Sequence, residues 1–355
     1  MKYKITVLGG DGIGPEVMEQ GLKVLNATAK KFNFEIETED ALIGAVAIDQ
    51  TGNPLPDESI ESCKKADAIL LGAVGHPKYD NDPTAKVRPE QGLLKLRKSL
   101  GLFANIRPVT TYEILYESSP IKTDRIKGVD FVVFRELTGG IYFGDKGTSE
   151  DGQSAYDTST YTVAEIDRIT RLAFDTALQR KKKVCLVDKA NVVETSRLWR
   201  KTVGEIAKEA KYAEIELENM FVDNAAMQLI QWPIQFDVIL TENMFGDIIT
   251  DEASVIPGSM GLLPSASVGA DLALFEPIHG SYPQAAGKNI ANPFATVLSI
   301  AMMLEHLKEF EAAAAIKKSV DKALNLGIVT EDISKENAKS TTEVGDWLAN
   351  DIKNN

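Results

Sequence analysis

The sequence predicts an α/β fold with a central mixed, largely parallel sheet, divided into two domains. Apolar runs typical of buried strands alternate along the chain with amphipathic segments, which is the order expected when helices cross over between parallel strands. The 355 residues exceed what one hydrophobic core usually organises, so two domains are favoured. No internal repeat or low-complexity tract interrupts this alternation.

The elements follow in order along the chain. The N-terminal part has a strand-like run at 3–9, a helical stretch at 16–32, a strand-like run at 66–75 and a helical stretch at 92–101. The middle repeats the pattern, with strand-like runs at 129–136, 183–191, 213–223 and 236–243 and helical stretches at 166–180 and 202–211. The polar, threonine-rich segment 144–162 has no helical period, and it predicts a hairpin or projecting arm, with a disordered loop as the alternative.

Charge and composition exclude several classes of protein. With 39 basic and 52 acidic side chains, the net charge of -13 opposes binding to nucleic acid or to an anionic membrane surface. No apolar run approaches the roughly 20 residues of a membrane span, and a charged strand pattern begins at Lys2, so we expect no signal peptide. Cys63 and Cys185 form no metal or disulfide pattern and are expected as buried thiols in the cytoplasm.

The glycine-rich start, "ITVLGGDGIGPEV", has two interpretations. In a dinucleotide-binding turn, Gly10 and Gly12 would take the first two glycine positions, and Glu35 or Glu37 would bind the ribose. The third glycine position is occupied by Pro15, however. The alternative is a tight strand-to-helix turn with the proline in the first helical turn.

Charged residues follow four of the strand-like runs. They are Arg135, Lys189, Asp223 and Asp247. Ligands of open parallel sheets bind beyond the carboxyl ends of the strands, so these residues are candidates for a common site. Each one alone is also explained by the exposure of strand ends to solvent.

Asp247 and Asp251 are four residues apart and would share one face of a helix. Carboxylates so placed suit a hard divalent cation, Mg²⁺ or Mn²⁺, with Asp223 as a third ligand. The alternative is that both lie in the first turns of a helix, where the helix dipole tolerates acidic residues.

Three arginines form a second group of candidates. Arg97, Arg107 and Arg135 carry guanidinium groups that can bind carboxylates in a bidentate manner, which suits a substrate with two carboxylates. Taken singly, each is better explained as a surface residue or an ion-pair partner.

Seven motifs in register identify a resemblance that covers essentially the whole chain. They are "GDGIGPEV", "LLKLRKSLGLFANIRPV", "RELTGGIYFG", "DKANVVETSRLWR", "VDNAAMQL", "TENMFGDIITDEAS" and "FEPIHGSYPQAAGKNIANP". The chain resembles the metal-dependent decarboxylating 2-hydroxyacid dehydrogenases, the isocitrate/isopropylmalate dehydrogenase family. This family does not use the Rossmann fold, so the resemblance favours the tight-turn interpretation of the N-terminal glycines.

Two stretches resemble the isopropylmalate branch of the family. "RELTGG" stands at 135–140, where relatives acting on isocitrate, homoisocitrate or tartrate usually have R-E-N-T-E-G. Glu90, Leu93, Leu94 and Val192 match positions that face the substrate's isopropyl group, although both leucines could simply be helix core. The resemblance implies NAD-dependent oxidative decarboxylation of 3-isopropylmalate to 4-methyl-2-oxopentanoate and CO₂ in leucine biosynthesis.

Two other activities remain as alternatives. The first is a sibling enzyme acting on D-malate, tartrate or homoisocitrate, against which "RELTGG" and the paired leucines count. The second is a catalytically silent regulatory subunit, and such subunits usually lose the tyrosine, lysine or metal carboxylates that this chain retains.

The resemblance also implies roles for individual residues. Lys189 is the base, acting with Asp223, and Tyr142 is the acid. The metal, Mg²⁺ or Mn²⁺, is held by Asp247, Asp251 and Asp223 of the partner subunit. The cofactor is NAD, whose adenosine end lies in the loop 279–292. A second cofactor segment, 76–90, runs towards the nicotinamide. The cofactor-binding residues are His76, Glu90, His279, Gly280, Ser281, Gln284, Ala285 and Asn292. Gln284 departs from the aspartate that NAD-using members usually have.

The implied architecture is a homodimer of two-domain chains with shared active sites. Residues 1–102 with 258–355 would form a discontinuous cofactor-binding domain. Residues 103–257 would bind substrate and metal, dimerise and carry the arm at about 144–162, with an active-site cleft between the domains.

Overall fold

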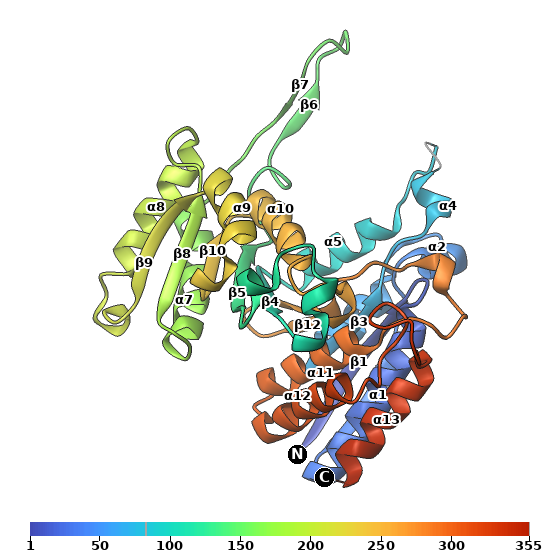
Figure 1. The fold of residues 1–355 in the computed structure, drawn as a ribbon. Helices are drawn as coiled ribbons and strands as arrows, with labels where there is room; N and C mark the ends of the chain where they lie inside the picture. The colour runs from blue at the N-terminus through green and yellow to red at the C-terminus, as the bar shows by residue number, and fades with distance from the viewer. Residues whose placement is uncertain (82–83, 355) are drawn as a thin grey trace. The chain divides into compact units, whose positions relative to one another are not determined.

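A computed structural model describes residues 1–81 and 84–354 of the chain (Figure 1). The chain divides into two compact units: Met1–Leu102 with Ser259–Asn355, and Phe103–Gly258. The boundary where the chain returns to the first unit lies between Gly258 and Ser259. The ranges expected from the resemblance place this boundary one residue earlier, between 257 and 258. The functions expected for the two units remain predictions.

The first unit is built from strands that alternate with helices. Its strands are β1 (Lys2–Gly10), β2 (Glu35–Asp40), β3 (Ala68–Ala73), β11 (Pro264–Val268) and β12 (Ala273–Pro277). Its helices are α1 (Gly14–Phe32), α2 (Ala45–Thr51), α3 (Asp57–Lys64), α4 (Pro77–Asp80), α5 (Pro89–Ser99), α11 (Phe294–His306), α12 (Phe310–Asn325) and α13 (Thr341–Asn354), with 3₁₀ turns η4 (Met260–Leu262) and η5 (Pro283–Ala285). The strand order is β2-β1-β3-β12-β11.

The sheet of the first unit is mixed and mostly parallel. The strands β2, β1, β3 and β12 pair in parallel, and β11 pairs with β12 in the antiparallel direction. Alternate strand residues such as Leu8, Ile69 and Leu71 pack with Ile60 of α3 and Leu96 of α5 in one hydrophobic cluster. Helix α1 contacts β3 and packs against α12 and α13, whereas α11 contacts β3 and β12 and packs against α12.

The second unit repeats this plan with different helices. Its strands are β4 (Ala104–Thr110), β5 (Asp130–Glu136), β6 (Lys146–Thr148), β7 (Ala155–Asp157), β8 (Lys183–Asp188), β9 (Glu216–Phe221) and β10 (Val238–Thr241). Its helices are α6 (Thr123–Ile126), α7 (Val163–Leu178), α8 (Glu194–Ile206), α9 (Val222–Gln231) and α10 (Asn243–Ser254), with 3₁₀ turns η1 (Glu113–Ser118), η2 (Ala210–Tyr212) and η3 (Pro233–Gln235). The order of its main strands is β4-β5-β10-β8-β9.

Successive residues of the central strands face opposite helical layers. Phe134 of β5 packs toward α7 and α8, whereas its neighbour Val133 packs toward α9 and α10. In β10, Leu240 and Ile239 divide in the same way. This alternation is the period of two expected for strands covered on both faces, and it explains why their sequences read as continuous apolar runs. The directions in which the strands pair confirm the predicted mixed, largely parallel sheet.

One strand of the second unit runs against the others. The strands β5, β10, β8 and β9 pair in parallel, whereas β4 is antiparallel to β5 and places Asn105 beside Arg135. The first residues of β4 therefore lie at the edge of the sheet where the parallel strands end. This edge is where ligands of such sheets bind.

The segment 144–162 contains a hairpin. Strands β6 and β7 pair in the antiparallel direction, with Gly147 opposite Tyr156, and the hairpin projects from the second unit in Figure 1. The predicted hairpin is confirmed. The side chain of Tyr156 is exposed.

The glycine-rich turn after β1 is shaped by close packing of backbone. A Cβ on Gly12 would overlap the carbonyl oxygen of Ser281, and Gly12 also has a φ of +58°. The carboxylate of Asp11 accepts hydrogen bonds from the backbone N–H groups of Ala45, Val46 and Gly75, so it ties three loops together. The tight-turn interpretation is confirmed, because these groups bind the protein's own backbone.

Cys63 and Cys185 are buried, free thiols, as predicted. Burial raises the pKa of each thiol to about 12, which keeps the unreactive thiol form at neutral pH. Within 1–81 and 84–354, no helix has the length and apolar character that a membrane crossing needs.

Replacing Gly12 by alanine should destabilise the protein more than the same change at Gly52. Both glycines have positive φ, which costs an alanine about 1 to 2 kcal/mol. Only at Gly12 would the new Cβ overlap backbone, adding about 1 to 3 kcal/mol, because no described atom lies within 4 Å of a Cβ at Gly52. Urea denaturation of both variants measures the difference. Equal losses would show that the loop at Ser281 yields without cost.

Candidate active site

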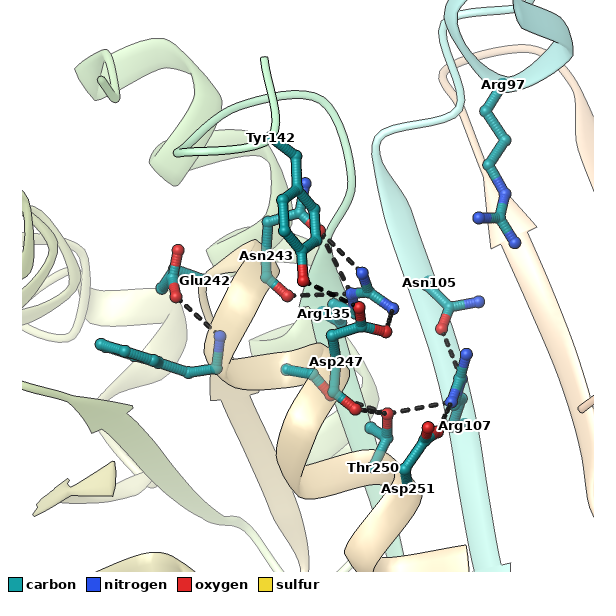
Figure 2. A network of polar contacts seen from close by, with 12 residues as sticks. Arg97, Asn105, Arg107, Arg135, Tyr142, Glu242, Asn243, Asp247, Thr250 and Asp251 are labelled. Carbon is teal, nitrogen blue, oxygen red and sulfur yellow. Dashed lines mark hydrogen bonds and ion pairs between the residues drawn. The ribbon is translucent and has the colours of Figure 1, made fainter. Parts of the chain in front are cut away.

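Candidate residues gather at the carboxyl edge of the sheet in the second unit. Arg135 is the second-last residue of β5, and the loop after that strand carries Tyr142. Helix α10 begins directly after β10 and carries Asp247 and Asp251. Figure 2 shows these side chains pointing toward one another above the strand ends.

The centre of this group is an ion pair between Arg135 and Asp247. The Arg135 side chain is only 8% exposed, and its guanidinium donates to Asp247 Oδ1. The other carboxylate oxygen, Oδ2, accepts a hydrogen bond of 2.9 Å from the Tyr142 hydroxyl. Partial burial, and then the bond to Asp247, raise the pKa of Tyr142, so its phenol stays protonated at neutral pH.

Arg107 and Asp251 form a second, more open pair beside the first. Arg107 Nη1 lies 3.2 Å from Asp251 Oδ1 and 2.9 Å from the Thr250 hydroxyl. Arg107 Nε donates to Asn105 Oδ1 at 2.8 Å. The Asp251 side chain is 78% exposed, so it keeps carboxylate surface for a further ligand. Thr250 and Asn105 therefore fix the direction of Arg107.

Helix α10 places both aspartates on one face, as their spacing predicted. No acidic residue lies in the first turn of α10, and the two aspartates are one and two turns further on. Because the effect of the helix dipole is strongest in the first turn, it contributes little to either aspartate. The aspartates are instead held by the two arginines.

A metal at this point would find oxygen ligands from two carboxylates. Within the described residues there is no group of three or more His, Cys, Asp or Glu side chains that could hold a metal ion. Asp223, the predicted third ligand, bonds to Lys189 and does not complete such a group with Asp247 and Asp251. Carboxylate oxygens suit Mg²⁺ or Mn²⁺, and two of them leave room for substrate and water.

Lys189 and Asp223 follow two adjacent parallel strands, β8 and β9. Lys189 Nζ lies 2.7 Å from Asp223 Oδ1, and its backbone N–H donates to Ser196 Oγ. The hydrogen bond from Lys189 lowers the pKa of Asp223. The two strands bring this predicted pair together, and the side chain of Asp223 is 63% exposed.

Arg97 lies in the first unit, on α5, and is held by a different acid. Its Nη2 bonds to Glu276 of β12 at 2.7 Å, and both side chains are largely buried. The Nε of Arg97 is buried without a hydrogen-bond partner among the described residues. A buried donor without an acceptor is costly.

The predicted apolar contacts fall on two surfaces. On α5, Glu90, Leu94 and Arg97 are spaced to share one helix face. The side chain of Leu94 is half exposed, whereas Leu93 packs partly against the core of the first unit. Val192, in the loop after Lys189, is 66% exposed. The helix-core alternative therefore fits Leu93 and does not fit Leu94.

The loop 279–292 of the first unit carries most of the predicted cofactor residues. Its anchor is Ser281, which is buried and accepts the Ile13 N–H at 2.8 Å. Gly280 and Gln284 are exposed. The ring nitrogen Nε2 of His279 is buried without a partner in the described part of the chain, and burial lowers the pKa of this histidine. A neutral imidazole nitrogen without a partner suits a ligand that supplies one.

Two residues of this loop use their side chains within the protein. Ala285 is 1% exposed and packs against Ile13 and Val17. The Asn292 amide donates to Asp332 at 3.0 Å and accepts the Phe294 N–H at 2.9 Å. Contacts of Ala285 or Asn292 with a cofactor would therefore have to come mainly from their backbone.

His76 and Glu90 bound the second predicted cofactor segment, 76–90. His76 caps α4, where its Nδ1 accepts the Lys78 N–H at 3.1 Å. Glu90 is exposed at the start of α5, near Gly75. Residues 82 and 83 of this segment lie outside the described residues.

Comparison with known proteins places this geometry in a family. Residues 4–348 match the model of "Isocitrate/isopropylmalate dehydrogenase". A 3-isopropylmalate dehydrogenase of Wolinella succinogenes is 55% identical over 353 residues, covering 98% of each chain. One of Bacteroides fragilis is 53% identical over 355 residues, covering 99% of each. The chain belongs to the isocitrate/isopropylmalate dehydrogenase family.

Solved structures of the family share the fold. The isocitrate dehydrogenase of Methylococcus capsulatus has a TM-score of 0.87 at 34% identity and covers 99% of each chain. A β-decarboxylating dehydrogenase of Thermococcus kodakarensis has a TM-score of 0.81 at 33% identity, covering 99% of this chain and 96% of its own. The motifs that indicated the family from sequence thus correspond to the whole fold.

Several residues around the candidate site were missed from the sequence. Asn243, Glu242 and Tyr161 are buried around Arg135, and Thr250 holds Arg107. Asn243 and Glu242 do follow an apolar strand run, which was the signal used for the other residues. Tyr161 stands in a polar segment, and nothing in its sequence surroundings indicates that it is buried.

Proposed function

We propose that the protein catalyses the NAD-dependent oxidative decarboxylation of 3-isopropylmalate to 4-methyl-2-oxopentanoate and CO₂, with Mg²⁺ or Mn²⁺, in leucine biosynthesis. The observation that carries the proposal is the cluster of Arg107, Arg135, Asp247, Asp251 and Tyr142 at the edge of one sheet. The curated relatives named 3-isopropylmalate dehydrogenase support the substrate.

The arginines bind the two carboxylates of the substrate. Arg107 and Arg135 are fixed by Asn105, Thr250 and Asp247 before any ligand arrives, so little side-chain entropy is lost on binding. Arg97 of the first unit contributes a third guanidinium, whose Nε has no partner within the described chain. Guanidinium groups match the geometry of carboxylates.

Two proton transfers are assigned to this chain's residues. The amine of Lys189 accepts the proton of the substrate hydroxyl, directly or through a water, and Asp223 Oδ1 holds its Nζ in position. Tyr142 is protonated at neutral pH and lies beside Asp247, and it donates the proton that replaces the lost carboxylate on carbon. A bound NAD would supply the hydride acceptor and the carboxylate would leave as CO₂, so each bond broken is matched.

The residues present fit the cation and the dinucleotide that this reaction needs. Asp247 and Asp251 supply hard oxygen donors on one helix face, completed by Asp223 of the partner subunit, and a divalent cation there would polarise the substrate's oxygens. For NAD, the unpartnered Nε2 of His279 and the exposed loop residues Gly280 and Gln284 offer contacts to the adenosine end.

Apolar side chains favour a branched alkyl group over a third carboxylate. Leu94 and Val192 expose their side chains although both are apolar, and Glu90 lies on the same face of α5 as Leu94. A third carboxylate placed against such residues would lose its hydration without gaining a partner. This is why 3-isopropylmalate is preferred here over a sibling substrate such as D-malate, tartrate or homoisocitrate.

The proposed assembly is a cytoplasmic homodimer with shared active sites. Helices α9 and α10 pack against each other, and exposed apolar side chains lie on them, on η3 or directly beside them: Met227, Ile230, Trp232, Ile234, Ile248 and Val255. Exposed large apolar side chains on neighbouring elements are typical of an interface with another protein. These elements include the helix that carries Asp247 and Asp251, which favours sites completed by a second copy.

The substrate is tested by following NADH formation with 3-isopropylmalate, D-malate, isocitrate and tartrate side by side, with Mg²⁺ or Mn²⁺. We expect the highest kcat/KM with 3-isopropylmalate and loss of turnover on adding a chelator, since the cation is needed to bind the substrate's oxygens. Higher efficiency with another acid would assign the enzyme to a sibling activity.

Shared active sites predict complementation between two inactive variants. Lys189→Ala should lower turnover by about 10²- to 10⁴-fold because the base is lost, and Asp247→Asn should weaken metal binding. In a mixed dimer, one site carries both changes and the other carries neither. Mixing the denatured variants and refolding them together should therefore restore measurable turnover. A mixture no more active than its parents would place Lys189 and Asp247 in the same chain's site.

Gln284 predicts a weaker preference for NAD over NADP than an aspartate would give. Its exposed amide can bond a ribose hydroxyl but carries no charge to repel a 2′-phosphate. Gln284→Asp should increase the ratio of kcat/KM for NAD to kcat/KM for NADP. The expected increase corresponds to a free-energy difference of about 1 to 3 kcal/mol, the contribution of one charged hydrogen bond. A wild-type preference for NADP, or an unchanged ratio in the variant, would place the discrimination at another residue.

A further inference from the structure

Asn243 is the first residue of α10, and its buried side chain bonds in two directions. Its Oδ1 accepts from Arg135 Nη2 at 3.0 Å and from Nε at 3.2 Å. Its Nδ2 donates to the carbonyl oxygen of Gly139 at 3.1 Å. Gly139 lies in the loop between β5 and the arm, three residues before Tyr142. One side chain therefore touches the substrate arginine and the loop of the acid.

The chemistry of the partners fixes the orientation of this amide. A guanidinium has only donors, so it requires the amide oxygen, and a backbone carbonyl has only acceptors, so it requires the amide NH₂. The side chain is 1% exposed, so water does not substitute for either partner. Both ends of the amide are thus needed, and no other residue type of this size supplies both.

The backbone of Asn243 is held from the opposite side. Its N–H donates to the Tyr161 hydroxyl at 2.9 Å, and that hydroxyl donates to Glu242 Oε2 at 3.1 Å. The Tyr161 ring packs where a Cβ on Gly139 would lie 2.7 Å from Cε1, so the same tyrosine also supports the loop. Asn243 is therefore fixed at its backbone before its side chain meets Arg135.

We propose that Asn243 is a positioning residue that sets Arg135 for substrate binding and sets the Tyr142 loop for proton donation. The inference rests on the proposed function, because it assigns those roles to Arg135 and Tyr142. The two halves of the amide act on different steps. The Oδ1 half acts on binding through Arg135, and the Nδ2 half acts on turnover through Gly139.

Two variants separate these halves. Asn243→Ala removes both, so KM for the substrate should rise by about 10- to 100-fold, the worth of a hydrogen bond to a charged group. Its kcat should also fall by about tenfold, as the acid loses its alignment. Asn243→Asp keeps an acceptor for Arg135 and loses the donor to Gly139. It should restore KM to near the wild-type value while kcat stays low.

The experiment measures kcat and KM for both variants and hydrogen exchange over residues 138–144. Exchange in that loop should increase in both variants, and this readout does not depend on activity. Thr170→Val is the control, because it removes another buried hydrogen bond in the same unit, from Thr170 Oγ1 to Ile166 O at 2.6 Å. The control should lower thermal stability and leave kcat, KM and loop exchange unchanged.

Three results would overturn the inference: wild-type constants in Asn243→Ala, equal losses of both constants in the two variants, or unchanged loop exchange. If Asn243→Ala does not fold, Asn243→Asp decides alone, since it retains the size of the side chain. Failure of the proposed function gives a different result, because the wild-type enzyme would then not turn over 3-isopropylmalate. In that case the variants are compared on whichever acid of the panel the wild type oxidises.

Discussion

The arrangement of the site depends on a cation buried at the end of a strand. The Arg135 guanidinium is almost fully removed from water, and an unpaired charge there would cost several kcal/mol. It is compensated by Asp247 and by the side-chain and backbone oxygens of Asn243. Gly246 is required by the same packing, because a Cβ there would lie 2.5 Å from Arg135 Cγ. These contacts fix the rotation of α10 against β5, and this rotation directs Asp251 toward Arg107.

The charges of the cluster balance before any ligand binds. Arg107 and Arg135 contribute two positive charges, and Asp247 and Asp251 contribute two negative ones. A divalent cation and a substrate with two carboxylates would add two charges of each sign, so the balance is kept when both bind together. Either one alone would leave an excess charge at the site. On a chain with a net charge of -13, this local neutrality lets a dianion approach.

Sequence patterns predicted the strands, the helices and the candidate site residues, because each of these depends on the order of neighbouring residues along the chain. The apolar runs and the four-residue spacing of Asp247 and Asp251 show which residues share a strand or a helix face. They do not show which strand runs against the others, so the antiparallel β4 that places Asn105 opposite Arg135 was outside their reach. Asn243 was also missed, since its partner Gly139 is 104 residues away and only tertiary packing joins them. Likewise, a single sequence does not reveal that the Asn292 amide is already engaged with Asp332.

In both units, an arginine assigned to the substrate forms an ion pair with an acidic side chain. Arg97 is paired with Glu276 on a neighbouring strand, just as Arg135 is paired with Asp247 on a neighbouring helix. Each acid holds its arginine in one direction. Replacing such pairs by apolar residues would often stabilise a fold, so the pairs are poorly explained by stability. They are better explained by binding, because a guanidinium that is already fixed loses less entropy when a carboxylate arrives.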